Sequence, residues 1–277
     1  MIERFAQFPR ALAERARVTR FGDVPVLLAH PDWDSAVPTI LWLHGRTVNK
    51  ELDPGRYLRW LRAGMAACAI DLPGHGERTV AAMQEPTGTM DVLTQAVGEI
   101  DGIVEHLAGR EWGGVFDLDR LAIGGMSAGG MVTLRRLCDP HPFVCASVEG
   151  TTGWLEGLYF AADGHTRVGA ARHARKRVLA VDTAPHLSTF RPMPLLALHS
   201  EADEVVPWSV QQQFLTRLRE HYTQVGADPR LVEAKTWPTT GAPQEHSGFG
   251  RAANEAKNVQ VEFFAKWLRA SRVGDDF

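Results

Sequence analysis

The stretch Gly125-Met126-Ser127-Ala128-Gly129 reads G-x-S-x-G and lies between an apolar run, residues 121–124, and a helix-prone segment, residues 131–137. A serine at the apex of a sharp strand-to-helix turn needs small neighbours, because its backbone is strained and other chain segments approach closely. Such a turn exposes the serine hydroxyl at the carboxyl end of a sheet. The pattern alone fits either a nucleophile or a plain glycine-rich turn. The rest of the chain has to separate the two.

Short apolar runs alternate with helix-like segments along the chain. The predicted strands largely lack period-two alternation, as is typical of strands buried on both faces. They are residues 24–28, 39–43, 66–70, 121–123, 144–148, 194–198 and 231–237. The predicted helices are residues 57–62, 92–108, 128–137, 209–225 and 253–270. This alternation predicts an α/β fold with a mostly parallel central sheet and helices on both faces.

The length of 277 residues is enough to bury one sizeable core, which favours a single domain over residues 1–277. Between about residues 151 and 188 the alternation stops, and an aromatic group is followed by a basic run. We expect this stretch to be a small helical insertion that acts as a lid. Because it follows a predicted strand, it would lie above the carboxyl ends of the strands, where open α/β sheets bind ligands.

Composition excludes several classes of protein. A net charge of −3 with 23% charged residues gives no dominant basic face, which argues against a nucleic-acid partner. Cys68, Cys138 and Cys145 are odd in number and lack metal-ligand spacing, so buried free thiols in a reducing compartment are expected. The amino-terminal residues lack the apolar region of a signal peptide, and no apolar run approaches the roughly 18–20 residues that span a bilayer. The sequence predicts a cytoplasmic protein without a membrane partner, either a monomer or a homodimer.

A serine nucleophile needs a base within hydrogen-bond reach and an acid that orients the base. Both should follow the serine, first the carboxylate and then the histidine, each on a loop after a later strand. Asp203 is the candidate acid, because its loop directly follows the predicted strand 194–198 and a short side chain before an apolar turn is easily held rigid. Glu201 and Glu204 in the same loop are alternatives, and the loop is otherwise a solvated acidic segment.

His246 is the candidate base, because it lies in a polar, glycine-containing loop between the last predicted strand and the last predicted helix. The other histidine after Asp203 is His221, which lies inside a predicted helix. The oxyanion of the reaction requires two backbone N–H donors. We assign these to Ala128, directly after the nucleophile, and to Arg46, in the turn after the predicted strand 39–43.

That turn contains two further residues of interest. Gly45 allows the backbone to approach the serine closely, and His44 is expected to be a buried hydrogen-bonding residue that shapes the turn rather than a base. The side chain of Arg46 is either a contact for an anionic substrate or a surface charge.

Four motifs, in this order, resemble the α/β-hydrolase superfamily. They are Leu43-His44-Gly45, the segment Asp71-Leu72-Pro73-Gly74-His75-Gly76, the G-x-S-x-G stretch and the loop from Asp203 to Pro207, with His246 after them. The resemblance covers about residues 41–250 and is nearest to the dienelactone-hydrolase-like and prolyl-oligopeptidase-like serine esterases. It implies an α/β-hydrolase fold and structural roles for Asp71 and His75.

Two departures narrow the activity that the resemblance implies. Dienelactone hydrolases proper carry a cysteine nucleophile, whereas Ser127 stands at that position here. The related peptidases usually carry a large amino-terminal propeller, and only about forty residues precede Leu41 in this sequence. A free-standing esterase is therefore the simpler interpretation.

The sequence thus predicts a serine hydrolase that cleaves small to medium carboxylic esters through an acyl-enzyme. Trp154 and Tyr159 are either substrate contacts or ordinary core of the insertion, and the basic residues at 172–177 either attract acidic substrates or form a solvated helix face. A thioesterase or small peptidase with the same three residues, Ser127, Asp203 and His246, is an alternative. A catalytically silent binding protein of the same fold is another. No metal and no organic cofactor is implied, since the two N–H donors and the base suffice and no His/Asp cluster has ligand spacing.

Overall fold

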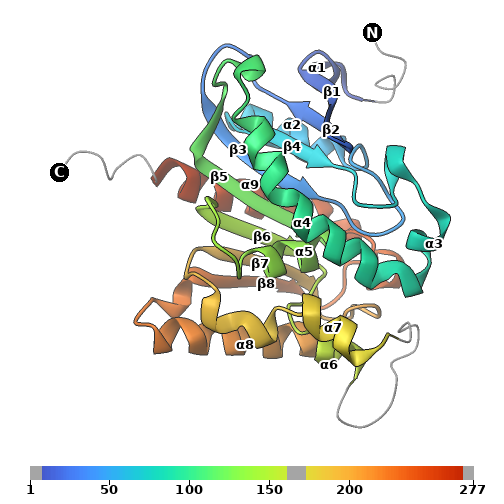
Figure 1. Ribbon diagram of the computed structural model, residues 1–277. Helices are drawn as coiled ribbons and strands as arrows, with labels where there is room; N and C mark the ends of the chain where they lie inside the picture. The colour runs from blue at the N-terminus through green and yellow to red at the C-terminus, as the bar shows by residue number, and fades with distance from the viewer. Residues whose placement is uncertain (1–7, 161–172, 271–277) are drawn as a thin grey trace.

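The structure, a computed structural model, describes residues 8–160 and 173–270. Within them an eight-stranded sheet has the order β1-β2-β4-β3-β5-β6-β7-β8 (Figure 1). The strands are β1 (Ala16–Phe21), β2 (Val24–Ala29), β3 (Val37–Leu43), β4 (Ala66–Ile70), β5 (Phe116–Met126), β6 (Cys145–Glu149), β7 (Leu195–Ser200) and β8 (Val232–Trp237). The pairings β1–β2 and β2–β4 are antiparallel, and the five pairings from β4–β3 to β7–β8 are parallel. The predicted mostly parallel sheet is confirmed.

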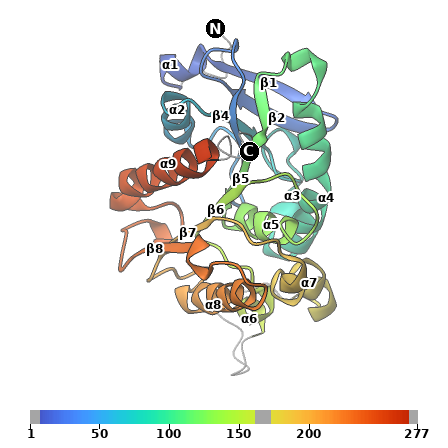
Figure 2. The ribbon, with the colours of Figure 1, turned by 90° about the vertical axis from the view of Figure 1, so that its left-hand side faces the viewer.

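Helices cover both faces of this sheet. The helices are α1 (Arg10–Ala13), α2 (Pro54–Arg62), α3 (Ala81–Gln84), α4 (Thr89–Leu107), α5 (Ala128–Arg136), α6 (Leu155–Tyr159), α7 (Arg175–Val181), α8 (Trp208–Gln224) and α9 (Ala253–Ala270). Buried apolar side chains of α1, α2 and α9 pack on one face, and those of α4, α5 and α8 pack on the other (Figure 2). All five predicted helices are present, and Asp53 caps α2 by accepting a hydrogen bond from the backbone N–H of Arg56.

β1 is the strand that the sequence analysis missed. It forms a hairpin with β2 through a turn in which Gly22 has a φ of +57°. Its residues are mostly only partly buried, and Arg17 and Arg20 lie among them. Charged side chains are typical of an edge strand that has only one neighbour. A search for apolar runs therefore does not detect it.

Strand register brings the loops of interest to one edge of the sheet. In β3, Leu43 lies beside Ile70 of β4 and Gly125 of β5. Glu149 at the end of β6 lies beside Met126 and Leu198. Because these are the carboxyl ends of parallel strands, the loops after β3, β4, β5, β6 and β7 all begin at the same edge.

The described residues of the stretch 151–188 include α6, α7 and a 3₁₀ segment at Ala184–Thr189. Residues 161–172 lie outside the described residues, and with them the first residue of the basic run. Within that run, Arg175 pairs with Glu156 and Arg177 pairs with Asp91, and both arginines are exposed. Of the two interpretations of the basic run, these two side chains fit the solvated helix face rather than a site for acidic substrates.

The three cysteines are buried free thiols, as predicted. Burial raises the pKa of each thiol, and for Cys138 the pKa rises to about 12. Neutral buried thiols are unreactive. No helix within residues 8–160 and 173–270 combines the length and the apolar character needed to cross a membrane.

Candidate active site

Ser127 lies at the apex of the turn between β5 and α5, with a φ of +51°. This is a left-handed conformation that L side chains rarely adopt, and it typically costs about 1–3 kcal/mol. Glycine is required on both sides of the turn: a Cβ added to Gly129 would lie 2.2 Å from the carbonyl oxygen of Leu43, and one added to Gly125 would lie 2.5 Å from the carbonyl carbon of Gly129. The turn has the close approaches that the G-x-S-x-G pattern predicts.

Neighbouring strand ends hold this strained turn in place. The backbone N–H of Ser127 donates to the carbonyl oxygen of Glu149 at 2.8 Å. The hydroxyl of Thr151 donates to the carbonyl oxygen of Ser127 at 2.7 Å. The serine backbone is therefore fixed on both sides by the end of β6 and the residues directly after it.

Three side chains from three loops form a chain of hydrogen bonds. The Nε2 atom of His246 lies 2.9 Å from the hydroxyl oxygen of Ser127, and its Nδ1 atom lies 2.8 Å from Oδ2 of Asp203. A carboxylate only accepts, so Nδ1 carries the proton and Nε2 is free to accept from the serine. The other oxygen of Asp203 accepts from the backbone N–H groups of Val205 and Val206, both at 2.8 Å. Asp203 is 5% exposed, which shields this arrangement from water.

The alternatives considered for these roles lie elsewhere. Glu201 is exposed and accepts a hydrogen bond from the hydroxyl of Thr236. Glu204 is exposed on the same loop. His221 is buried in α8, where its Nε2 atom lies 2.8 Å from the carbonyl oxygen of Phe190. The geometry therefore favours Asp203 and His246 over them.

The loop after β3 lies against the serine. A Cβ added to Gly45 would lie 3.5 Å from Cβ of Ser127, so the backbone here is close to the nucleophile. Among the described residues, the N–H groups of Arg46 and Ala128 donate to no other part of the protein. Unoccupied N–H groups on either side of a serine are what an oxyanion requires.

Buried polar contacts fix the shape of this loop. His44 is 4% exposed, its Nε2 atom accepts from the N–H of Leu72 at 3.0 Å, and burial lowers its pKa to about 4. Asp71 accepts from both the N–H and the ammonium of Lys50, at 3.0 and 2.6 Å. Nδ1 of His75 lies 2.8 Å from the carbonyl oxygen of Pro73. The buried hydrogen-bonding role predicted for His44 is confirmed. Asp71 and His75 are both fully buried, which agrees with the structural roles that the resemblance implies.

Glu245 is a residue of the site that the sequence analysis did not identify. Its carboxylate accepts from the N–H and hydroxyl of Thr240 at 2.6 and 2.8 Å, from the N–H of Gly241 at 2.7 Å and from the hydroxyl of Ser200 at 2.8 Å. These bonds join the His246 loop to the end of β7, where the Asp203 loop begins. They also hold two strained residues, since Gln244 and Glu245 have φ values of +52° and +50°. Glu245 therefore has the contacts of a positioning residue for His246.

We expect Glu245→Gln to lower kcat by about 10–100-fold with a smaller change in KM, because an amide cannot accept all four hydrogen bonds and the imidazole loses its position relative to Ser127. Four donors lower the pKa of Glu245 from 4.5 to about 2. The stability that the ionised carboxylate provides is then complete above its ordinary pKa and is lost as the pH falls toward 2. The difference in melting temperature between wild type and Glu245→Gln should accordingly be largest near neutral pH and shrink in acid.

Two variants provide the comparison for this prediction. Glu204→Gln removes the same charge from an exposed position on the neighbouring loop, and we expect little change in kcat. Glu245→Asp keeps the charge and should recover part of the activity. Equal losses in Glu245→Gln and Glu204→Gln would show that the hydrogen bonds of Glu245 do not position the histidine.

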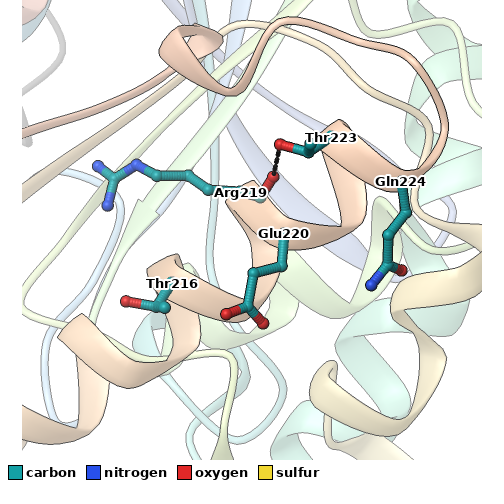
Figure 3. Close-up of a pocket in the computed structure, with 5 residues that line it drawn as sticks. All are labelled: Thr216, Arg219, Glu220, Thr223 and Gln224. Carbon is teal, nitrogen blue, oxygen red and sulfur yellow. Dashed lines mark hydrogen bonds between the residues drawn. The ribbon is translucent and has the colours of Figure 1, made fainter.

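A cavity of about 670 Å³ opens beside the serine. Its lining comes from the loops after β3 and β8, from α2 and from α9. The lining includes Trp42, Arg46, Leu52, Asp53, Arg56, Tyr57, Met126, Ser127, Glu149, Val205, Gln244, His246 and Lys257. A separate hollow of about 390 Å³ is lined by five residues of α8, which Figure 3 shows, and Ser127, Asp203 and His246 are not among them. The cavity beside Ser127 is therefore the candidate substrate site among the described residues.

Trp154 and Tyr159 do not line that cavity. The guanidinium of Arg217 on α8 lies 4.1 Å from the ring centroid of Trp154, in a cation–π contact. Burial raises the pKa of the Tyr159 phenol to about 12, and the charge of nearby Arg46 partly offsets this. Tyr159 is the last residue of α6.

Comparisons with known proteins agree with the fold. Residues 56–271 match the prolyl oligopeptidase family. The chain is 26% identical over 261 residues to Esterase YjfP of Escherichia coli (strain K12), which covers 89% of this chain and 96% of that protein. TT1662 from Thermus thermophilus superposes with a TM-score of 0.66 at 22% identity, over 92% of this chain and 98% of that chain. An acylaminoacyl peptidase from Pyrococcus horikoshii gives a TM-score of 0.69 at 17% identity, over 95% of this chain and 43% of the peptidase.

At 22% and 17% identity, the two solved structures show that this chain shares their fold. The family match extends over well over half of the chain and includes the serine turn, the Asp203 loop and His246. The resemblance to prolyl-oligopeptidase-like esterases is confirmed. The chain belongs to the prolyl oligopeptidase family and is a serine hydrolase of the α/β-hydrolase fold.

Proposed function

We propose that the protein hydrolyses small to medium carboxylic esters through an acyl-enzyme on Ser127, with His246 as the base and Asp203 as the acid. The observation that supports this most is the pair of hydrogen bonds, 2.9 Å and 2.8 Å long, that joins Ser127 to His246 and His246 to Asp203. It occurs on a strained turn that faces a cavity. Strain of this kind, held by surrounding contacts, is typical of an active site.

In this mechanism Nε2 of His246 takes the proton of Ser127 as the hydroxyl oxygen attacks the ester carbonyl carbon. The carboxylate of Asp203 stabilises the imidazolium, and the N–H groups of Arg46 and Ala128 bind the oxyanion. As the tetrahedral intermediate collapses, His246 gives the proton to the leaving alcohol. Water then attacks the acyl-enzyme by the same route and releases the acid.

A peptidase or thioesterase with the same three residues is the second candidate. The match to the prolyl oligopeptidase family and the likeness of this chain to part of an acylaminoacyl peptidase support the peptidase. Amides have a much poorer leaving group than esters, and cleaving them requires His246 to protonate an amine as it leaves.

Matched substrates with one acyl group and an ester, thioester or amide bond distinguish these candidates. We expect the highest kcat/KM for the p-nitrophenyl ester of a short or medium acyl group. The kcat/KM of the aminoacyl amide should be lower by about 100-fold or more, which is the size of a general acid–base contribution. Rapid thioester cleavage without ester cleavage would overturn the assignment of the bond.

Other predictions from the sequence belong to this proposal and stay predictions. They are a cytoplasmic location, a monomer or homodimer without a nucleic-acid partner, and a single domain in which residues 151–188 form a lid. Trp154 and Tyr159 would contact the acyl group from that lid. The residues 161–172 that would complete it lie outside the described part of the chain.

A further inference from the structure

The cavity beside Ser127 has a charged wall, formed by Asp53, Arg56, Glu149 and Lys257, that takes no part in the proposed reaction. Arg56 and Glu149 form a two-bond ion pair, with Nη1–Oε1 at 2.5 Å and Nη2–Oε2 at 2.9 Å. They are 5% and 1% exposed. Gln260 joins them by accepting from Arg56 and donating to Glu149, and the guanidinium lies 4.3 Å from the ring centroid of Trp42. A buried pair with such partners is closed to a further ligand.

A second ion pair in this wall is more accessible. Nζ of Lys257 on α9 lies 2.9 Å from Oδ1 of Asp53, and the side chains are 20% and 26% exposed. The other carboxylate oxygen of Asp53 accepts from Nε of Arg56 at 3.3 Å. Both oxygens of Asp53 are thus occupied, as are both of Glu149. An ammonium carries three N–H donors, so Lys257 retains donors after it has bonded to Asp53.

The position of His246 indicates which part of an ester this cavity holds. Gln244, His246 and Ser247 line it together with Lys257. In the proposed mechanism Nε2 of His246 gives its proton to the leaving oxygen, so the alcohol part of the ester leaves on the side of the imidazole. The side of the cavity lined by these residues is then the site of the alcohol part.

We propose that the cavity selects esters whose alcohol part carries an anionic group, a carboxylate or a phosphate, and that Lys257 is the residue that binds it. This proposal rests on the ester hydrolysis proposed above. Leu52 and Val205 at the cavity are 57% and 42% exposed and provide apolar contact for the carbon chain between the ester and the anion. A cationic alcohol is disfavoured, because the carboxylates of the wall already have partners.

The acetate esters of γ-hydroxybutyrate and γ-hydroxybutyramide test this selection, because they have nearly the same size and leaving oxygen and differ in charge. We expect the wild type to favour the carboxylate in kcat/KM by about tenfold, the scale of one hydrogen bond between charged groups. Lys257→Met should bring this ratio to one or below, because the carboxylate of Asp53 then loses its ammonium partner. The ratio is independent of the fraction of folded enzyme. The acetate of a hydroxyalkyl phosphate of equal length shows which of the two anions is preferred.

Lys235→Met is the matched control. Lys235 lies on β8, is 43% exposed, pairs with Glu255 and does not line the cavity, so the ratio should stay at its wild-type value. A wild-type ratio at or below one, a preference for the cationic ester acetylcholine, or an unchanged ratio in Lys257→Met would each overturn the proposal. Failure of the ester hydrolysis itself is a different result, since then no acetate would be cleaved and Ser127 would not react with a fluorophosphonate.

Discussion

Replacing Ser127 with alanine is expected to lower kcat for ester hydrolysis by about 10⁵–10⁶-fold, the range known for a serine that acts together with its base. The hydroxyl lies 2.9 Å from Nε2 of His246, its hydrogen-bond partner in the structure. Without it no acyl-enzyme forms. The oxyanion donors and the cavity would still bind the ester, so a residual rate above that of water should remain.

Covalent labelling makes this result independent of the choice of substrate. A fluorophosphonate should modify the wild type at Ser127, as read by mass spectrometry of the peptides, and should leave Ser127→Ala unmodified. Ser35→Ala is a suitable control, because Ser35 is exposed and its hydroxyl donates only to Asp32 in the structure. Labelling of Ser127→Ala at the wild-type rate, or a folded wild type that does not react, would show that the nucleophile lies elsewhere.

The fold could be predicted from the sequence because most of its strands are buried on both faces. The runs in β2 and β4 are apolar throughout and β7 is apolar up to Leu198, and each was predicted within two residues of its observed bounds. β5 was predicted as only residues 121–123, because Asp117, Asp119 and Arg120 interrupt the apolar pattern of a strand that begins at Phe116. The register shift between Pro38 and Thr39 lies opposite this polar segment. Such irregular pairing depends on the neighbouring strand and leaves no local pattern.

The hydrogen-bonded chain of the site could be predicted because its three members lie in loops that follow three strands of the sheet, β5, β7 and β8. The charged wall could not be predicted, because its contacts join residues that are far apart in sequence, such as Arg56 with Gln260 and Asp53 with Lys257. One signal was present: Glu149 ends the buried strand β6, and a carboxylate at such a position requires a partner. Glu245 gave a weaker signal, a carboxylate directly before His246.

Asp203→Asn is expected to lower kcat by about 10⁴-fold, the cost known for the same change in a serine triad. The introduced amide can keep its oxygen toward the N–H groups of Val205 and Val206 and then presents its NH₂ group to Nδ1 of His246. Nδ1 must accept from that group, so the proton moves to Nε2, and Nε2 can no longer take the proton of Ser127. The backbone contacts remain, and the melting temperature should change far less than the rate.

Glu201→Gln separates this tautomer effect from a general loss of negative charge in the loop. Glu201 is exposed and accepts from Thr236 rather than from His246, so its replacement should change kcat by less than about twofold, as expected for a surface charge that is largely screened. Measuring kcat for both variants with the same p-nitrophenyl ester, together with their melting temperatures, tests the assignment. Comparable losses in the two variants would mean that the charge of the loop matters and not the bond to Nδ1. A loss confined to Asp203→Asn in a fully folded protein would make Asp203 the residue that sets the tautomer of His246.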